Sequence, residues 1–69
     1  MENIISFIER KLNASRKYPQ YANNFFGQAF GALEYHCATH PEDESDLICA
    51  WEETYYNAFN AIIYGGDAV

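Results

Sequence analysis

The stretch Leu47–Ile63, LICAWEETYYNAFNAII, decides the fold class. Its apolar residues return every three or four positions, which is the spacing of one face of an α-helix with its step of about 100° per residue. The members of that face are Leu47, Ile48, Trp51, Tyr55, Ala58, Phe59, Ile62 and Ile63. No alternation of apolar and polar residues, the pattern of a half-buried strand, competes with it. The stretch predicts an amphipathic helix with an aromatic-rich buried face.

Residues on either side of this stretch place the third predicted helix at 41–64. Pro41 suits the first turn of a helix, where the missing N–H would have no partner in any case. Four carboxylates follow, and negative charge is favourable at the positive end of the helix dipole. They are Glu42, Asp43, Glu44 and Asp46, which we name the acidic pole. Gly65 suits the position directly after a helix, so we expect the helix to end at Tyr64.

Two earlier segments carry the same helical spacing of apolar residues. The stripe of the segment 3–17 consists of Ile4, Ile5, Ile8 and Leu12. The face of the segment 20–38 is broader and consists of Ala22, Phe25, Phe26, Ala29, Ala32, Leu33 and Cys37. A face this wide suits a central helix that contacts both of its neighbours. Pro19 disfavours the helical conformation at Tyr18 and therefore separates the two segments.

These patterns predict an all-α protein, a small three-helix up-down-up bundle with helices at about 3–17, 20–38 and 41–64. The 69 residues make a single helical domain, 1–69, and the 17% of aromatic residues bury much area for so short a chain. Short connections force neighbouring helices to run antiparallel. We therefore expect the acidic pole at one end of the bundle, and Arg16 and Lys17 at the other end near Gly65.

The charge distribution is uneven along the chain. The net charge is −6, and all four basic residues lie between Arg10 and Lys17, whereas none follows Tyr35. Nucleic-acid binding needs a broad basic surface, so we expect no direct contact with nucleic acid. No apolar run approaches the roughly 20 residues that span a bilayer, and Met1–Asn3 lacks the basic start of a signal peptide. We expect a cytoplasmic protein that does not enter membranes.

Two histidines and two cysteines make the only arrangement that suggests a metal site. Cys37 and His40 share a helix face, and Cys49 lies beyond the following turn, so zinc ligands are an alternative. The chain has no CxxC pair, which favours the simpler interpretation of two reduced thiols in an apolar helix hairpin. We expect no metal ion and no other cofactor.

His36 is predicted near the middle of the apolar face of the second helix. Glu52 lies at a similar height on the edge of the third, so we expect a structural hydrogen bond between them. A buried histidine and carboxylate also suit acid–base catalysis, which is the alternative. A catalytic site further needs a substrate pocket and a nucleophile or cofactor, so we expect no enzyme.

Three surface features point to contacts with other proteins. Gly27 and Gly31 lie opposite the apolar face of their helix, where a flat surface would accept a second chain. Tyr35, Tyr56 and Tyr64 lie on polar sides or flanks, and tyrosine is enriched in interfaces. The acidic pole carries more charge than the dipole requires, and the surplus suits a partner with a basic surface.

We therefore expect a small, acidic, non-enzymatic protein-binding module. A short acidic helical chain without an enzyme motif looks like the small inhibitors carried by phages and mobile elements, which include anti-CRISPR proteins and DNA mimics. By this analogy the chain engages a basic nucleic-acid-binding surface of a host enzyme. A structural or regulatory homodimer that uses the Gly27 and Gly31 face is one alternative, and a small zinc-binding or acid–base protein is another.

Overall fold

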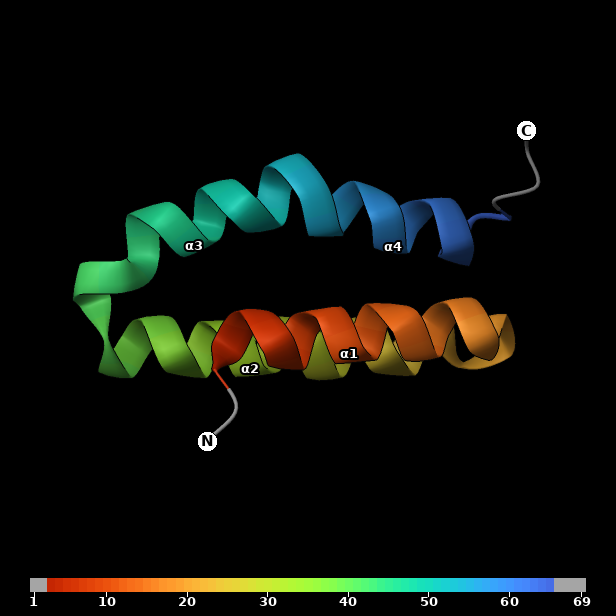
Figure 1. Ribbon diagram of the computed structural model, residues 1–69, viewed down its shortest axis with the longest axis horizontal. Coiled ribbons are helices and arrows are strands. Elements are labelled where there is room, and N and C mark those ends of the chain that lie inside the picture. Colours follow the sequence, from red (N-terminus) through yellow and green to blue (C-terminus); the bar gives the residue numbers. More distant parts are fainter. Residues whose placement is uncertain (1–2, 66–69) are drawn as a thin grey trace.

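Pro19 and Pro41 divide the chain into three helical arms (Figure 1). The structure is a computed structural model and describes residues 3–65. The first arm is α1 (Ile4–Lys17), and the second is α2 (Ala22–Thr39). Each proline begins a short 3-10 turn, and these turns connect the arms at Pro19–Tyr21 and Pro41–Asp43. The described residues contain no strand, so the prediction of an all-α, up-down-up bundle is confirmed.

The third arm differs from the single α-helix that the sequence predicts over 41–64. It consists of α3 (Glu44–Ala50), a π-helical turn (Trp51–Tyr55) and α4 (Tyr56–Ile63), which follow one another without a break. In the π-helical turn the backbone N–H of Tyr56 donates to the carbonyl oxygen of Trp51, five residues back. π-Helical turns are rare, so this one needs a local cause.

The spacing of the buried side chains supplies that cause. Leu47, Trp51, Tyr55 and Phe59 are each four residues apart and are all buried. In an α-helix a step of four residues overshoots a full turn by about 40°, so the stripe would rotate away from the core. The wider π-helical turn takes up the extra residue and keeps all four side chains on the side that faces α1 and α2.

The core lies along the line where the three arms meet. Its buried residues are Ile8, Leu12, Ala29, Leu33, Leu47, Trp51, Tyr55 and Phe59. Phe26 packs between the largest rings, with its ring centroid 5.6 Å from that of Trp51 and 5.5 Å from that of Phe59. The expectation of a shielded Trp51 is confirmed, because only 4% of this residue is exposed.

Two side chains, one before α1 and one within it, make hydrogen bonds to the backbone of this helix. Asn3 is the N-cap of α1, since its Oδ1 accepts a hydrogen bond from the backbone N–H of Ser6 at 2.8 Å. Ser15 is completely buried, and its hydroxyl donates to the carbonyl oxygen of Lys11 at 2.9 Å. The buried hydroxyl therefore has a partner within its own helix, as buried polar groups require.

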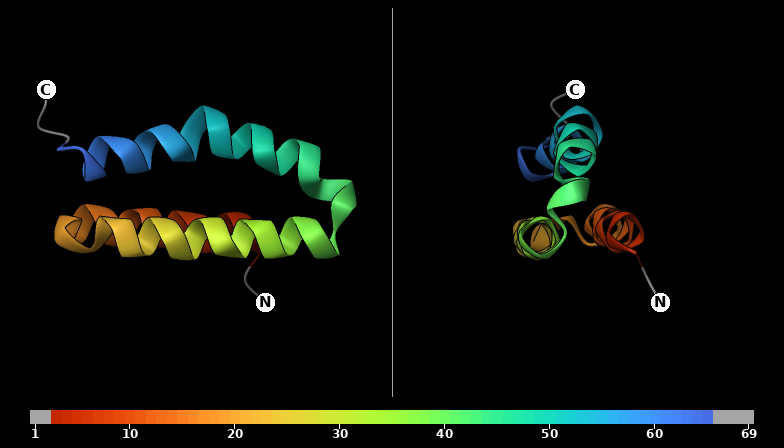
Figure 2. Two further views of the ribbon diagram at one scale, coloured as in Figure 1. Left: turned by 180° about the vertical axis from the view of Figure 1, so that it is seen from behind. Right: turned by 90° about the vertical axis from the view of Figure 1, so that its left-hand side faces the viewer.

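The arms are arranged so that the two charged ends lie apart. Viewed along the bundle, the three arms occupy the corners of a triangle (Figure 2). The end of α1, with Arg16 and Lys17, lies beside the end of α4, and the turn at Pro41–Asp43 lies at the opposite end (Figure 1). The predicted separation of charge is confirmed. The hairpin of α2 and α3 also extends beyond the start of α1, which leaves this end with two helices.

Candidate functional site

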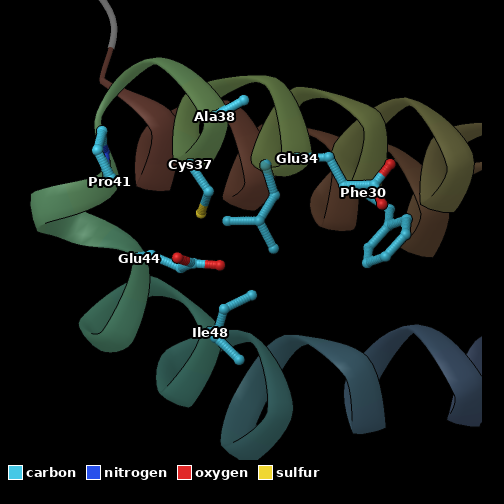
Figure 3. Close-up of a pocket in the computed structure, with 8 residues that line it drawn as sticks. Phe30, Glu34, Cys37, Ala38, Pro41, Glu44 and Ile48 are labelled. Atoms are coloured by element: carbon cyan, nitrogen blue, oxygen red, sulfur yellow. The ribbon is translucent and has the colours of Figure 1, made fainter.

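A groove opens between α2 and α3 at the end of the molecule where these helices extend beyond α1. It has a volume of about 520 Å³. Its lining residues are Phe30, Leu33, Glu34, Cys37, Ala38, Pro41, Glu44 and Ile48 (Figure 3). Leu33 is almost fully buried and belongs to the core, whereas Phe30 remains 39% exposed. We name this feature the α2–α3 groove.

The polar groups of the α2–α3 groove are two carboxylates on opposite sides. Glu34 comes from α2 and Glu44 from the first turn of α3, and the Glu44 side chain points across the groove toward Cys37 (Figure 3). Neither carboxylate has a hydrogen bond or an ion pair with any other described residue. No lysine or arginine lines the groove, so its field is negative.

Cys37 lies in this negative field and is half-buried. Burial raises the pKa of the Cys37 thiol, and the negative charges of Glu44 and Asp43 raise it further. A nucleophilic cysteine needs the opposite environment, because the thiolate is the reactive form. The surroundings of Cys37 therefore favour a protonated, unreactive thiol.

A second hollow of about 450 Å³ adjoins the α2–α3 groove along α3. Three residues, Pro41, Glu44 and Ile48, line both hollows, and Cys49 lines only the second. Cys49 is exposed, and both cysteines are free. The two hollows thus form one continuous apolar surface with the Glu44 carboxylate at their boundary.

His36 has a different partner from the predicted one. Its Nε2 lies 3.1 Å from Oδ2 of Asp43, whereas Glu52 is exposed, so the predicted hydrogen bond to Glu52 is wrong. The reason is the tight 3-10 turn, which brings Asp43 back over the last turn of α2. The His36 ring also stacks on His40, with ring centroids 4.5 Å apart. These contacts fasten the turn to α2.

The alternative zinc ligands do not converge. Within residues 3–65, no group of three or more His, Cys, Asp or Glu side chains is placed to hold a metal ion, so Cys37, His40 and Cys49 make no such site. The ring of His40 instead stacks on His36, and its Nδ1 lies 3.0 Å from the hydroxyl of Thr39.

The four carboxylates of the acidic pole differ in their contacts. Asp43 is occupied by His36, whereas the carboxylates of Glu42, Glu44 and Asp46 are exposed and have no partner within the described chain. Glu44 and Asp46 lie in the first turn of α3, as expected for residues that favour the positive end of the dipole. Only Glu44 also lines the groove.

The predicted interface residues do not form one patch. Gly27 and Gly31 lie on an open face of α2, since an added Cβ at either would meet no atom within 4 Å. Tyr35 and Tyr64 are exposed at opposite ends of the molecule. Tyr56 is also exposed, but its ring packs near Phe26 with 6.2 Å between centroids.

The sequence pattern alone does not reveal the α2–α3 groove. A helical wheel places Leu33 and Cys37 on the core face, but it does not show how far apart two helices lie. One available signal is the pair Phe30 and Glu34, an aromatic residue and a carboxylate one turn apart at the edge of that face.

Comparisons with known proteins gave no match. No protein-family model, no curated protein and no solved structure matches this chain. Within residues 3–65 no helix combines the length and the apolar character needed to cross a membrane.

Proposed function

We propose that this chain is a non-enzymatic protein-binding module that binds a basic partner protein at the end formed by α2 and α3. The observation that supports this most directly is a set of exposed carboxylates beside the α2–α3 groove that have no cationic partner within residues 3–65. These carboxylates are Glu34, Glu42, Glu44 and Asp46. The cations that could neutralise them all lie between Arg10 and Lys17 in α1.

The exposed carboxylates act on a partner before the two proteins touch. Carboxylates that no internal cation neutralises create a field that attracts a basic protein and accelerates its association. Salt screens such a field within about 8 Å at physiological ionic strength. Binding should therefore be fastest at low salt and slow as salt is added.

The side chains with catalytic potential support a binding role over an enzymatic one. The high pKa of the Cys37 thiol disfavours a nucleophile, and His36 is engaged with Asp43. The contact between His36 and Asp43 instead holds the turn between α2 and α3 against α2.

In its narrower form, the proposal is an inhibitor of the kind carried by phages or mobile elements. It would occupy the basic nucleic-acid-binding surface of a host enzyme, as anti-CRISPR proteins and DNA mimics do. The net charge of −6 and the concentration of carboxylates at one end support this form. A host enzyme with a basic cleft would be the partner, in the compartment where the chain is made, which we take to be the cytoplasm.

The second candidate is a structural or regulatory homodimer. Its support is the open α2 face at Gly27 and Gly31, where an added Cβ would have nothing within 4 Å outside the local helix backbone. Concentration-dependent mass in sedimentation experiments distinguishes this candidate, because the first proposal needs no self-association.

The test compares two variants of equal charge. The partner is recovered from the source cell with the tagged chain and identified by mass spectrometry. Its association rate is then measured with Glu42→Gln/Glu44→Gln and with the control Glu52→Gln/Glu53→Gln, four carboxylates that are all exposed. Asp43 is left unchanged because it holds His36.

We expect the first variant to slow association about threefold to tenfold, in line with the sensitivity of association rates to interface charge. The control variant, Glu52→Gln/Glu53→Gln, should change the logarithm of the association rate by less than half as much. An association rate that ignores both the first variant and the ionic strength would contradict the proposed function.

A further inference from the structure

The shape of the α2–α3 groove restricts what can occupy it. The groove runs between two helices, and its lining on α2 extends from Phe30 to Ala38. Eight residue steps of helix correspond to about 12 Å, which is the length of about two turns. A helix laid between α2 and α3 would match this length and would complete a four-helix packing at this end of the molecule.

The chemistry of the lining restricts the occupant further. The apolar part of the lining includes Phe30 on α2 and Ile48 on α3, and the carboxylates are those of Glu34 on α2 and Glu44 on α3 (Figure 3). A complementary helix would present an apolar stripe with a lysine or arginine on each side of it. Helices that dock in grooves use anchors at positions i, i+3 or i+4, and i+7.

We propose that the α2–α3 groove binds a basic amphipathic helix of the partner protein. Apolar residues of that helix lie over Phe30 and Ile48, and its flanking cations pair with Glu34 and Glu44. This inference rests on the proposed function and names the element of the partner that is bound. Ala38 and Pro41 provide the shallow, uncharged wall that lets the helix approach closely.

A second copy of the chain does not fit this description. Its basic amphipathic helix is α1, whose apolar residues Ile8 and Leu12 are buried in its own core. Two of its cations are also engaged, since Arg10 and Lys11 lie 5.3 Å and 5.2 Å from the Phe7 ring centroid. Docking of α1 into another copy would require it to leave its own core.

The direct test uses a designed peptide as the probe. A helical peptide of about 14 residues carries leucines at i, i+3, i+4 and i+7 and lysines on both flanks. Its control has the same composition in an order that destroys the stripe. Affinities of both for the whole chain are measured by fluorescence anisotropy, and we expect the amphipathic peptide to bind at least about tenfold more tightly.

Two matched pairs of variants then locate the site. Ala38→Lys places a cation in the groove, whereas Ala61→Lys makes the same charge change at an exposed position of α4 outside it. We expect Ala38→Lys to weaken binding about tenfold and Ala61→Lys less than about twofold. Glu34→Gln/Glu44→Gln should weaken binding about threefold to tenfold, and Glu52→Gln/Glu53→Gln should have a smaller effect.

The outcomes separate this inference from the proposed function. Equal binding of the two peptides, or equal effects of Ala38→Lys and Ala61→Lys, would overturn the groove inference and leave a charge-driven binding module intact. Failure of both peptides to bind at low salt would overturn the proposed function as well. Circular dichroism monitors the fold of each variant. If Ala38→Lys unfolds the chain, the comparison of Glu34→Gln/Glu44→Gln with Glu52→Gln/Glu53→Gln tests the groove, and equal effects of the two would overturn the inference.

Discussion

The hydrogen bond between Tyr55 and Glu9 joins the π-helical turn to α1, and its removal should have a measurable cost. The Tyr55 hydroxyl donates to Oε2 of Glu9 at 2.8 Å, and the tyrosine is 8% exposed. Tyr55→Phe keeps the ring in the core and removes only this bond. Hydrogen bonds to charged groups contribute about 1.5–3 kcal/mol. Glu9 is exposed, so in the variant its carboxylate can form a hydrogen bond to water instead. We therefore expect a loss of roughly 1 kcal/mol.

The assay is thermal and urea unfolding followed by circular dichroism. A loss of this size lowers the Tm of so small a domain by about 4–8 °C. Tyr35→Phe is the control, because Tyr35 is 73% exposed and its hydroxyl has no partner in the described chain. A cycle with Glu9→Gln and the double variant isolates the coupling between the two side chains.

The same bond predicts a pH dependence. Burial raises the pKa of Tyr55, and the hydrogen bond to Glu9 and its negative charge raise it further. Because the folded state then holds this proton more tightly than the unfolded state, the contribution is fully present below pH 10.0 and is lost as the pH rises through the folded pKa. Tyr55→Phe should lack this loss. Additive single and double variants, within about 0.3 kcal/mol, would refute the reasoning.

Three further predictions concern stability. Trp51→Ala should cost roughly 3–5 kcal/mol and abolish cooperative thermal unfolding, because Trp51 is 4% exposed at the centre of the core. Gly27→Ala and Gly31→Ala should each stabilise by about 0.5–1 kcal/mol in urea unfolding, since both sites have room for a Cβ; destabilisation with loss of dimer mass would instead favour the homodimer. His36→Gln should lower the Tm without altering metal content; stoichiometric zinc lost with this change would contradict a structural role.

The helical arms were predictable because the local signals agree. Pro19 and Pro41 mark both breaks, Asn3 caps the start, and the apolar spacing of each arm identifies its buried face. The separation of the charged ends follows from the short connections alone. Each of these features depends on residues that are close in sequence, so one amino-acid sequence is enough to predict them.

The features that sequence reasoning missed depend on residues in different arms or on a change of helix type. The π-helical turn follows from the need of Trp51 and Tyr55 to face the same neighbours, and a wheel with fixed step does not show it. Asp43 displaces Glu52 as the partner of His36 because of the exact path of a three-residue turn. The groove depends on the distance between α2 and α3.

The proposed function would account for the carboxylates at the groove end that have no partner within residues 3–65 and that contribute little to folding. Glu42 and Asp46 are spaced by four residues along a helical stretch, where like charges repel by a few tenths of a kcal/mol. One or two carboxylates would satisfy the positive end of the α3 dipole. A chain shaped only for stability would place one of its cations beside Glu44, yet all of them lie in or near α1. Neutral substitutions at Glu42 and Glu44 should therefore leave the Tm unchanged or higher while they slow binding, which is the signature of residues retained for a partner.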